Sequence, residues 1–169
     1  MEQEIKNRVA DSGILQIDPK DFIPITTLTE LDIKGWLFEE LILKEKDFRE
    51  YIRQHNWQQY DGVAVAVYCS VDAIIPTWAY MLVSEALQLH ASTIFFGNTI
   101  QLKEKLTTDA IEKINIENYR NKRIVVKGCG EENFSPAVYM LLTQKLKPVV
   151  RSIMFGEPCS TVPVYKSKL

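Results

Sequence analysis

The chain has few histidines, few cysteines and almost no net charge. Its 169 residues include two histidines, three cysteines, 20 basic residues and 22 acidic residues. A net charge of −2 gives no general attraction to nucleic acid or to an anionic membrane surface. No apolar run approaches the roughly 20 residues needed to span a bilayer, and the opening residues MEQEIKNR lack the apolar core of a secretory signal. We therefore expect a protein that binds neither nucleic acid nor membranes.

The cysteine content limits the chemistry that the thiols can serve. An odd number of cysteines without an export signal argues against a disulfide framework. The sequence also has no Cys-x-x-Cys pair, so any site that joins these thiols must be assembled by the tertiary structure. We expect the protein to be located in the reducing cytoplasm, where thiols remain available as metal ligands or nucleophiles.

The length and composition suit one soluble α/β domain over residues 1–169. Apolar residues make up 46% of the chain and charged residues 25%, and no repeat or Gly/Ser/Pro-rich linker marks a boundary. Residues 1–60 are expected to form a mostly helical lead-in, because Phe48, Tyr51, Ile52 and His55 recur at helical spacing. Residues 61–165 are expected to form a β-α-β-α-β-α-β core.

The core is predicted from four short apolar runs separated by helical patterns. Near-continuous apolar strands are typical of a parallel sheet that is covered on both faces. Ser135 and Pro136 have the residue types that cap and open a helix. We therefore expect a three-layer α/β sandwich whose four-stranded sheet is mainly parallel, in the order 2-1-3-4. The expected strands are 63–68, 92–97, 123–128 and 149–155, and the expected helices are 76–90, 102–114 and 136–147.

Each cysteine follows one of the predicted strands, and this placement predicts a site. Cys69, Cys129 and Cys159 come after the first, third and fourth strands. Because parallel strands end at a common edge of their sheet, we expect the three thiols to lie close together. Clustered thiolates need a cation, since like charges repel. Three thiolates with Asp72 would suit zinc, and three thiolates with an open position would suit iron or an iron–sulfur cluster.

Two other interpretations of the cysteines remain open, and a third is disfavoured. A thiol enzyme or sulfur-relay protein would carry a persulfide on Cys159 or Cys129. In a non-enzymatic interaction module the cysteines would be incidental, small buried side chains. A Cys-His nucleophilic pair is disfavoured, because His90 is expected about 20 Å from the cysteine edge. His55 precedes the first predicted strand and is not expected to reach the thiols either.

Four segments of the chain are distinctive: LKEKDFRE at 43–50, CSVDAIIPTWAYM at 69–81, KGCG at 127–130 and GEPCSTVPVYK at 156–166. They resemble a bacterial family of unknown function. The resemblance spans almost the whole chain, and its most distinctive part is the closing segment. Members of that family tend to be encoded beside iron–sulfur cluster assembly genes, so the resemblance implies an accessory role in that process with assembly proteins as partners. It implies no catalytic residues.

Overall fold

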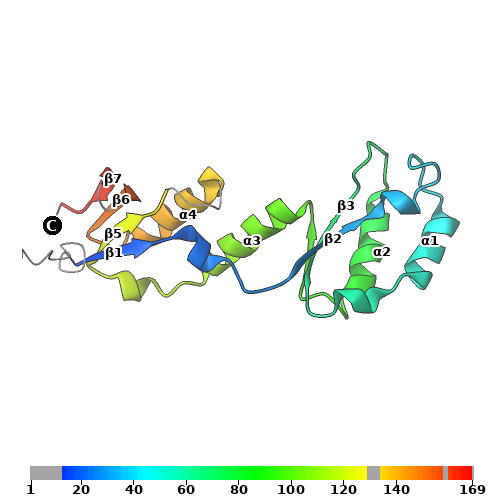
Figure 1. The fold of residues 1–169 in the computed structure, drawn as a ribbon, viewed down its shortest axis with the longest axis horizontal. Helices are drawn as coiled ribbons and strands as arrows, with labels where there is room; N and C mark the ends of the chain where they lie inside the picture. The colour runs from blue at the N-terminus through cyan, green and yellow to red at the C-terminus, as the bar shows by residue number, and fades with distance from the viewer. Residues whose placement is uncertain (1–12, 129–133, 158–159, 169) are drawn as a thin grey trace, which may run out of the picture. The chain divides into compact units, whose positions relative to one another are not determined.

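The computed structural model describes residues 13–128, 134–157 and 160–168 (Figure 1). The chain divides into two compact units, one made of residues 25–103 and the other of residues 1–24 together with 104–169. The first unit is continuous in sequence, whereas the second is built from both ends of the chain. Each unit contains its own sheet.

The unit of residues 25–103 is built on a three-stranded parallel sheet in the order β2-β3-β4. The central strand is buried along most of its length, as expected of the run Ala-Val-Ala-Val-Tyr. A helix follows each of the first two strands, so the order is β2-α1-β3-α2-β4. The bounds are β2 (Leu28–Asp32), α1 (Glu45–Gln54), β3 (Ala64–Tyr68), α2 (Thr77–Leu87) and β4 (Thr93–Phe96).

Both helices of this unit pack on one face of its sheet (Figure 1). Val65 and Val67 point to the same face because side chains alternate along a strand. They share one hydrophobic cluster with Phe48 of α1 and Val83 and Leu87 of α2. Trp36 also belongs to this cluster, and the partly buried Trp57 and Trp78 pack against it.

The second unit is built on a mixed four-stranded sheet in the order β1-β5-β6-β7. The first three strands are parallel, and β7 returns antiparallel to β6. Val138, Leu142 and Leu146 of α4 pack in one cluster with Ile124 and Ile153 of the sheet. The bounds are β1 (Ile14–Ile17), β5 (Arg123–Val126), α4 (Pro136–Leu146), β6 (Ser152–Glu157) and β7 (Ser160–Lys166), and α3 (Thr99–Glu112) contains the boundary between the units.

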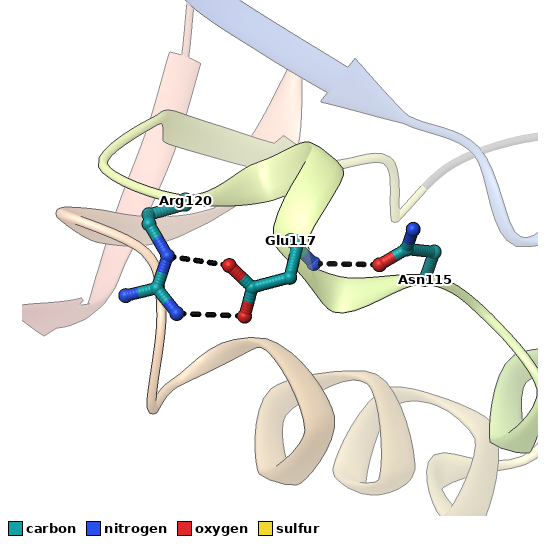
Figure 2. Close-up of polar contacts among 3 residues, drawn as sticks. All are labelled: Asn115, Glu117 and Arg120. Carbon is teal, nitrogen blue, oxygen red and sulfur yellow. Dashed lines mark hydrogen bonds and ion pairs between the residues drawn. The ribbon is translucent and has the colours of Figure 1, made fainter.

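The chain enters β5 through an exposed turn of 3-10 helix, Ile116–Tyr119 (Figure 2). The Oδ1 atom of Asn115 accepts a hydrogen bond of 3.1 Å from the amide of Glu117. Arg120 donates two hydrogen bonds of 2.6 Å to the carboxylate of Glu117, and these bonds lower the pKa of that carboxyl group. Arg120 is therefore engaged within its own turn. Exposed ion pairs contribute little to stability, so we assign the Arg120–Glu117 pair only the role of holding this turn.

The predicted α/β class is confirmed, but the predicted single sheet is wrong. The four predicted strands exist, but β3 and β4 belong to one sheet and β5 and β6 to the other. The order 2-1-3-4 is therefore also wrong. The sheet that contains β5 and β6 is mixed because β7 pairs antiparallel with β6, and β7 was not predicted. The physical reason is that the apolar pattern of a strand shows its burial and not its neighbours.

The predicted helical lead-in is also wrong for residues 13–60. This segment contains β1 and β2 as well as α1. β1 pairs with β5, and β2 pairs with β3, so the segment supplies one parallel strand to each sheet. The helix α2 buries only one face, formed by Ala79, Val83 and Leu87, and Met81 on it is 66% exposed.

The turn before α1 holds two glutamates in the left-handed backbone region. Glu39 has a φ of 51° and Glu40 a φ of 56°, and the amide of Phe38 donates a 2.8 Å hydrogen bond to the carbonyl of Ile42 across the turn. This conformation costs most residues about 1–2 kcal/mol, but asparagine tolerates it.

We therefore expect Glu40→Asn to raise the free energy of unfolding by about 0.5–1 kcal/mol, measured by urea denaturation. Glu40→Gln is the matched control, since it removes the same charge without favouring the left-handed region. Equal stability of the two variants would contradict the prediction.

Candidate functional site

The structure describes two of the four predicted site residues, and both lie in the unit of residues 25–103. Cys69 directly follows β3 and is half-buried against the core of that unit. Asp72 is exposed in the loop between β3 and α2. Cys129 and Cys159 lie outside the described residues, so the meeting of the three thiols stays a prediction. Within the described parts of the chain, no three His, Cys, Asp or Glu side chains gather as a metal site.

Asp32 organises the end of the sheet where Cys69 lies. It is the last residue of β2, and it accepts hydrogen bonds from the amides of Lys34 at 3.0 Å and Ser70 at 3.1 Å. The hydroxyl of Ser70 donates a further bond of 2.6 Å to the same carboxylate. Burial raises the pKa of Asp32, but the hydrogen bonds from Ser70 and Lys34 outweigh it and hold the pKa below its ordinary value. One carboxylate thus fixes the loops that follow β2 and β3.

Glu30 ties the same end of the sheet to the start of α3. It accepts hydrogen bonds of 2.9 Å from the hydroxyls of Thr99 and Tyr68. These bonds lower the pKa of Glu30, with that from Thr99 as the largest cause. Asn98 and Gln101 form a reciprocal capping box at this helix end, each side chain accepting from the other residue's amide at 3.0 Å. Because Glu30 accepts a hydrogen bond from Thr99, the first residue of α3, its carboxylate lies at the N-terminus of that helix, where the helix dipole favours negative charge.

The surroundings of Cys69 are acidic and phenolic. Burial is the main cause that raises the pKa of Tyr80, with smaller electrostatic contributions from Cys69 and Asp32. The carboxylates of Glu30 and Asp32 are already engaged in hydrogen bonds. This arrangement fixes the start of the loop that follows Cys69.

The two histidines are used elsewhere in this unit. The Nδ1 atom of His90 lies 2.5 Å from Oδ1 of Asp61, and its carbonyl accepts a 2.8 Å hydrogen bond from the amide of Gly62, before β3 begins. Cys69 follows the other end of β3, so the prediction that His90 does not serve it is confirmed. His55 packs against Trp57, and its Nε2 lies 3.1 Å from the hydroxyl of Tyr60. Burial lowers the pKa of His55.

In the second unit, Gly128 is required by the packing of an aromatic ring. A Cβ atom at this position would lie 2.1 Å from Cζ of Phe155, so no side chain fits without displacing the ring. Phe155 also makes an edge-on contact with Tyr139 at 5.5 Å between ring centroids. Both aromatic residues line a largely apolar pocket of about 430 Å³ beside α4. Sequence reasoning missed this pocket, because β7, which contributes Val164 to it, was not predicted.

The helix that follows Cys129 in the sequence begins as predicted. The hydroxyl of Ser135 accepts a 3.3 Å hydrogen bond from the amide of Ala137, and Pro136 is the first helical residue of α4. The same hydroxyl donates to the carboxylate of Glu104. The prediction of a helix capped by Ser135 is therefore confirmed.

Comparison with known proteins places the chain in a family. A family model described as "Protein of unknown function (DUF2480)" matches residues 3–167. The chain belongs to this family. No curated protein and no solved structure matches the chain. The predicted resemblance to a family of unknown function is thus confirmed, while its link to iron–sulfur assembly stays a prediction. Over the described residues, no helix has both the length and the apolar character to cross a membrane.

Proposed function

We propose that the protein is a cytoplasmic accessory factor of iron–sulfur cluster assembly, and that Cys129 and Cys159 supply thiolates to a metal ion or cluster. The observation that supports this proposal is the parallel pairing of β5 and β6, with Val126 opposite Phe155. Neighbouring parallel strands end at the same edge of a sheet. Cys129 comes three residues after the end of β5, and Cys159 comes two residues after the end of β6.

The chemistry of thiolate ligands is the reason that we propose iron, an iron–sulfur cluster or zinc. Two thiolates brought near each other repel, and a bound cation relieves that repulsion. Iron–sulfur clusters and zinc are both held by cysteine thiolates. A pair of protein thiolates leaves coordination positions for other ligands, which suits a protein that receives and passes on metal or cluster. The accessory role itself rests on the family resemblance.

Cys69 and Asp72 enter the proposal differently from the other two residues. The expectation that Cys69 meets the other thiols rested on one shared sheet, but β3 belongs to the sheet of the other unit. Asp72 lies in the loop after the same strand. We therefore propose the pair Cys129 and Cys159 as the essential ligands. Cys69→Ser then becomes a matched control for the loss of one thiol.

The test is anaerobic purification followed by iron, zinc and sulfide analysis, with absorption spectra before and after addition of iron and sulfide. We expect Cys129→Ser and Cys159→Ser each to lower the bound metal at least about tenfold, since even outer-shell partners of a metal are worth that much. Cys69→Ser and Asp72→Asn should retain it. No metal in the parent protein, together with spectra unchanged by iron and sulfide, would overturn the proposal. Equal losses in all three cysteine variants would overturn the two-thiolate version.

A sulfur-relay role is the second candidate. The observation that favours it is the capped start of α4 six residues after Cys129, because a helix N-terminus lowers the pKa of a nearby thiol. In that case an alkylating probe would label Cys129 or Cys159 far faster than Cys69, and the protein would hold no metal. Equal and slow labelling of all three thiols would exclude it.

A further inference from the structure

A second pocket lies beside α1, in the unit of residues 25–103, and has no part in the function proposed above. Its volume is about 510 Å³, within the range of about 300–1,000 Å³ typical of small-molecule sites. The turn after β2 supplies one side of it, and α1 supplies the other. Its lining includes Trp36, Phe38, Glu39, Asp47, Glu50 and Tyr51.

Three aromatic side chains line this pocket. The rings of Trp36 and Tyr51 are nearly parallel, with an interplanar angle of 6° and centroids 6.2 Å apart. Trp36 is only 9% exposed and is held by edge-on contacts to Phe48, His55 and Trp57. Tyr51 is 44% exposed and offers ring surface to a ligand, whereas the 43% exposed ring of Phe38 already has Nζ of Lys44 over one face. Of the three rings, Trp36 is fixed by the core of the unit.

The charged side chains that line the pocket are all acidic. Glu39, Asp47 and Glu50 line it, and no lysine or arginine does. Glu50 is paired with Arg53, whose hydrogen bond is the main cause that lowers the pKa of this glutamate. Within the described residues, the side chains of Glu39 and Asp47 make no hydrogen bond or ion pair. These two carboxylates are thus the unpaired acidic groups of the pocket lining.

Aromatic rings and free carboxylates together favour an organic cation. A cation over an aromatic face gains about 0.5–2 kcal/mol, and aromatic cages recognise quaternary ammonium groups. The structure shows that one of these rings accepts an ammonium group, because Nζ of Lys44 lies 3.0 Å from the centroid of Phe38. A bare metal ion prefers several oxygen ligands at short distance, and the described residues form no such group.

We propose that this pocket binds the methylated ammonium group of a small organic molecule. Tyr51 supplies exposed aromatic surface, backed by the stacked ring of the buried Trp36, and Glu39 and Asp47 supply the opposite charge. The volume exceeds that of a trimethylammonium group, so the pocket also holds part of the molecule that carries it. The left-handed φ of 51° at Glu39 is consistent with a turn shaped for this purpose, since strained residues concentrate at binding sites.

The test is a titration with three compounds of similar size, followed by tryptophan fluorescence and calorimetry. Choline carries a methylated ammonium group, ethanolamine a primary ammonium group, and 3,3-dimethyl-1-butanol is the neutral isostere of choline. We expect saturable binding of choline, and about tenfold weaker binding of the other two. Sodium chloride at equal concentration controls for ionic strength. No saturable binding of choline, or equal binding of the neutral isostere, would overturn the proposal.

Variants locate the binding within the molecule. Tyr51→Leu removes one exposed ring, and we expect it to weaken choline binding about three- to tenfold. The double variant with Glu39→Gln and Asp47→Asn should weaken it by a similar factor without altering any aromatic ring. Glu40→Gln is the matched control, because Glu40 is the neighbour of Glu39 but does not line the pocket. Unchanged affinity in the double variant, or an equal loss in the control, would overturn the assignment.

Discussion

Replacing Phe48 by alanine is expected to lower the free energy of unfolding of the 25–103 unit by about 3–5 kcal/mol. Phe48 is fully buried and is the only buried residue of α1. Its ring makes edge-on contacts with Trp36 at 5.6 Å and Trp78 at 6.0 Å between centroids. Truncation leaves a cavity where α1, α2 and the sheet meet, and the rigid rings around it cannot close it.

Urea denaturation followed by tryptophan fluorescence measures this effect in one unit, because all three tryptophans belong to residues 25–103. Phe96→Ala is the matched control, since Phe96 is 69% exposed. The control should cost about 1 kcal/mol or less. A loss below about 1 kcal/mol for Phe48→Ala would show that α1 does not depend on this contact, and would contradict the core described above.

Replacing Asp32 by asparagine is expected to cost about 1–3 kcal/mol at neutral pH, because three hydrogen bonds to a carboxylate are weakened. The effect should depend on pH. The pKa of Asp32 is lowered in the folded protein, so the carboxylate stabilises the fold above its unfolded pKa, and that contribution is lost as the pH falls through the folded value. The difference between parent and variant should therefore shrink below about pH 4.

Urea denaturation at several pH values between 7 and 3 checks this prediction. Asp72→Asn is the matched control, because it makes the same chemical change in the loop after β3, where the side chain is exposed. The control should shift the stability by less than about 0.5 kcal/mol at every pH. A cost for Asp32→Asn that stays constant from pH 7 to pH 3 would mean that the hydrogen bonds do not depend on the negative charge.

The sequence predicted individual elements better than their assembly. The apolar runs that became β3, β4, β5 and β6 were recognised because buried strands have a distinctive composition. The short segments that became β1 and β2 were missed because ILQI and LTELD mix polar and apolar residues beside prolines. Strand pairing was not predictable, since each strand's partner lies far away in the sequence. All four predicted strands were assigned to one sheet, whereas the structure divides them between two sheets.

The candidate site was predictable only in part for the same reason. Cys69 was correctly expected at the carboxyl end of a parallel strand, and His90 was correctly expected away from it. Asp32 and Glu30, which organise that end of the sheet, were not found because β2 was not predicted. Their signal was present as two acidic residues with alternate spacing, Glu-Leu-Asp, after a short segment rich in threonine and leucine.

The placement of β1 and β2 has a consequence for synthesis on the ribosome. Ala64 to Tyr68, the partners of β2, follow soon after it in the chain, so residues 25–103 can fold as soon as they leave the exit tunnel. Ile14 pairs with Arg123, so β1 must wait with its polar backbone groups unpaired until most of the polypeptide has been made. The nascent chain therefore completes its middle before its ends.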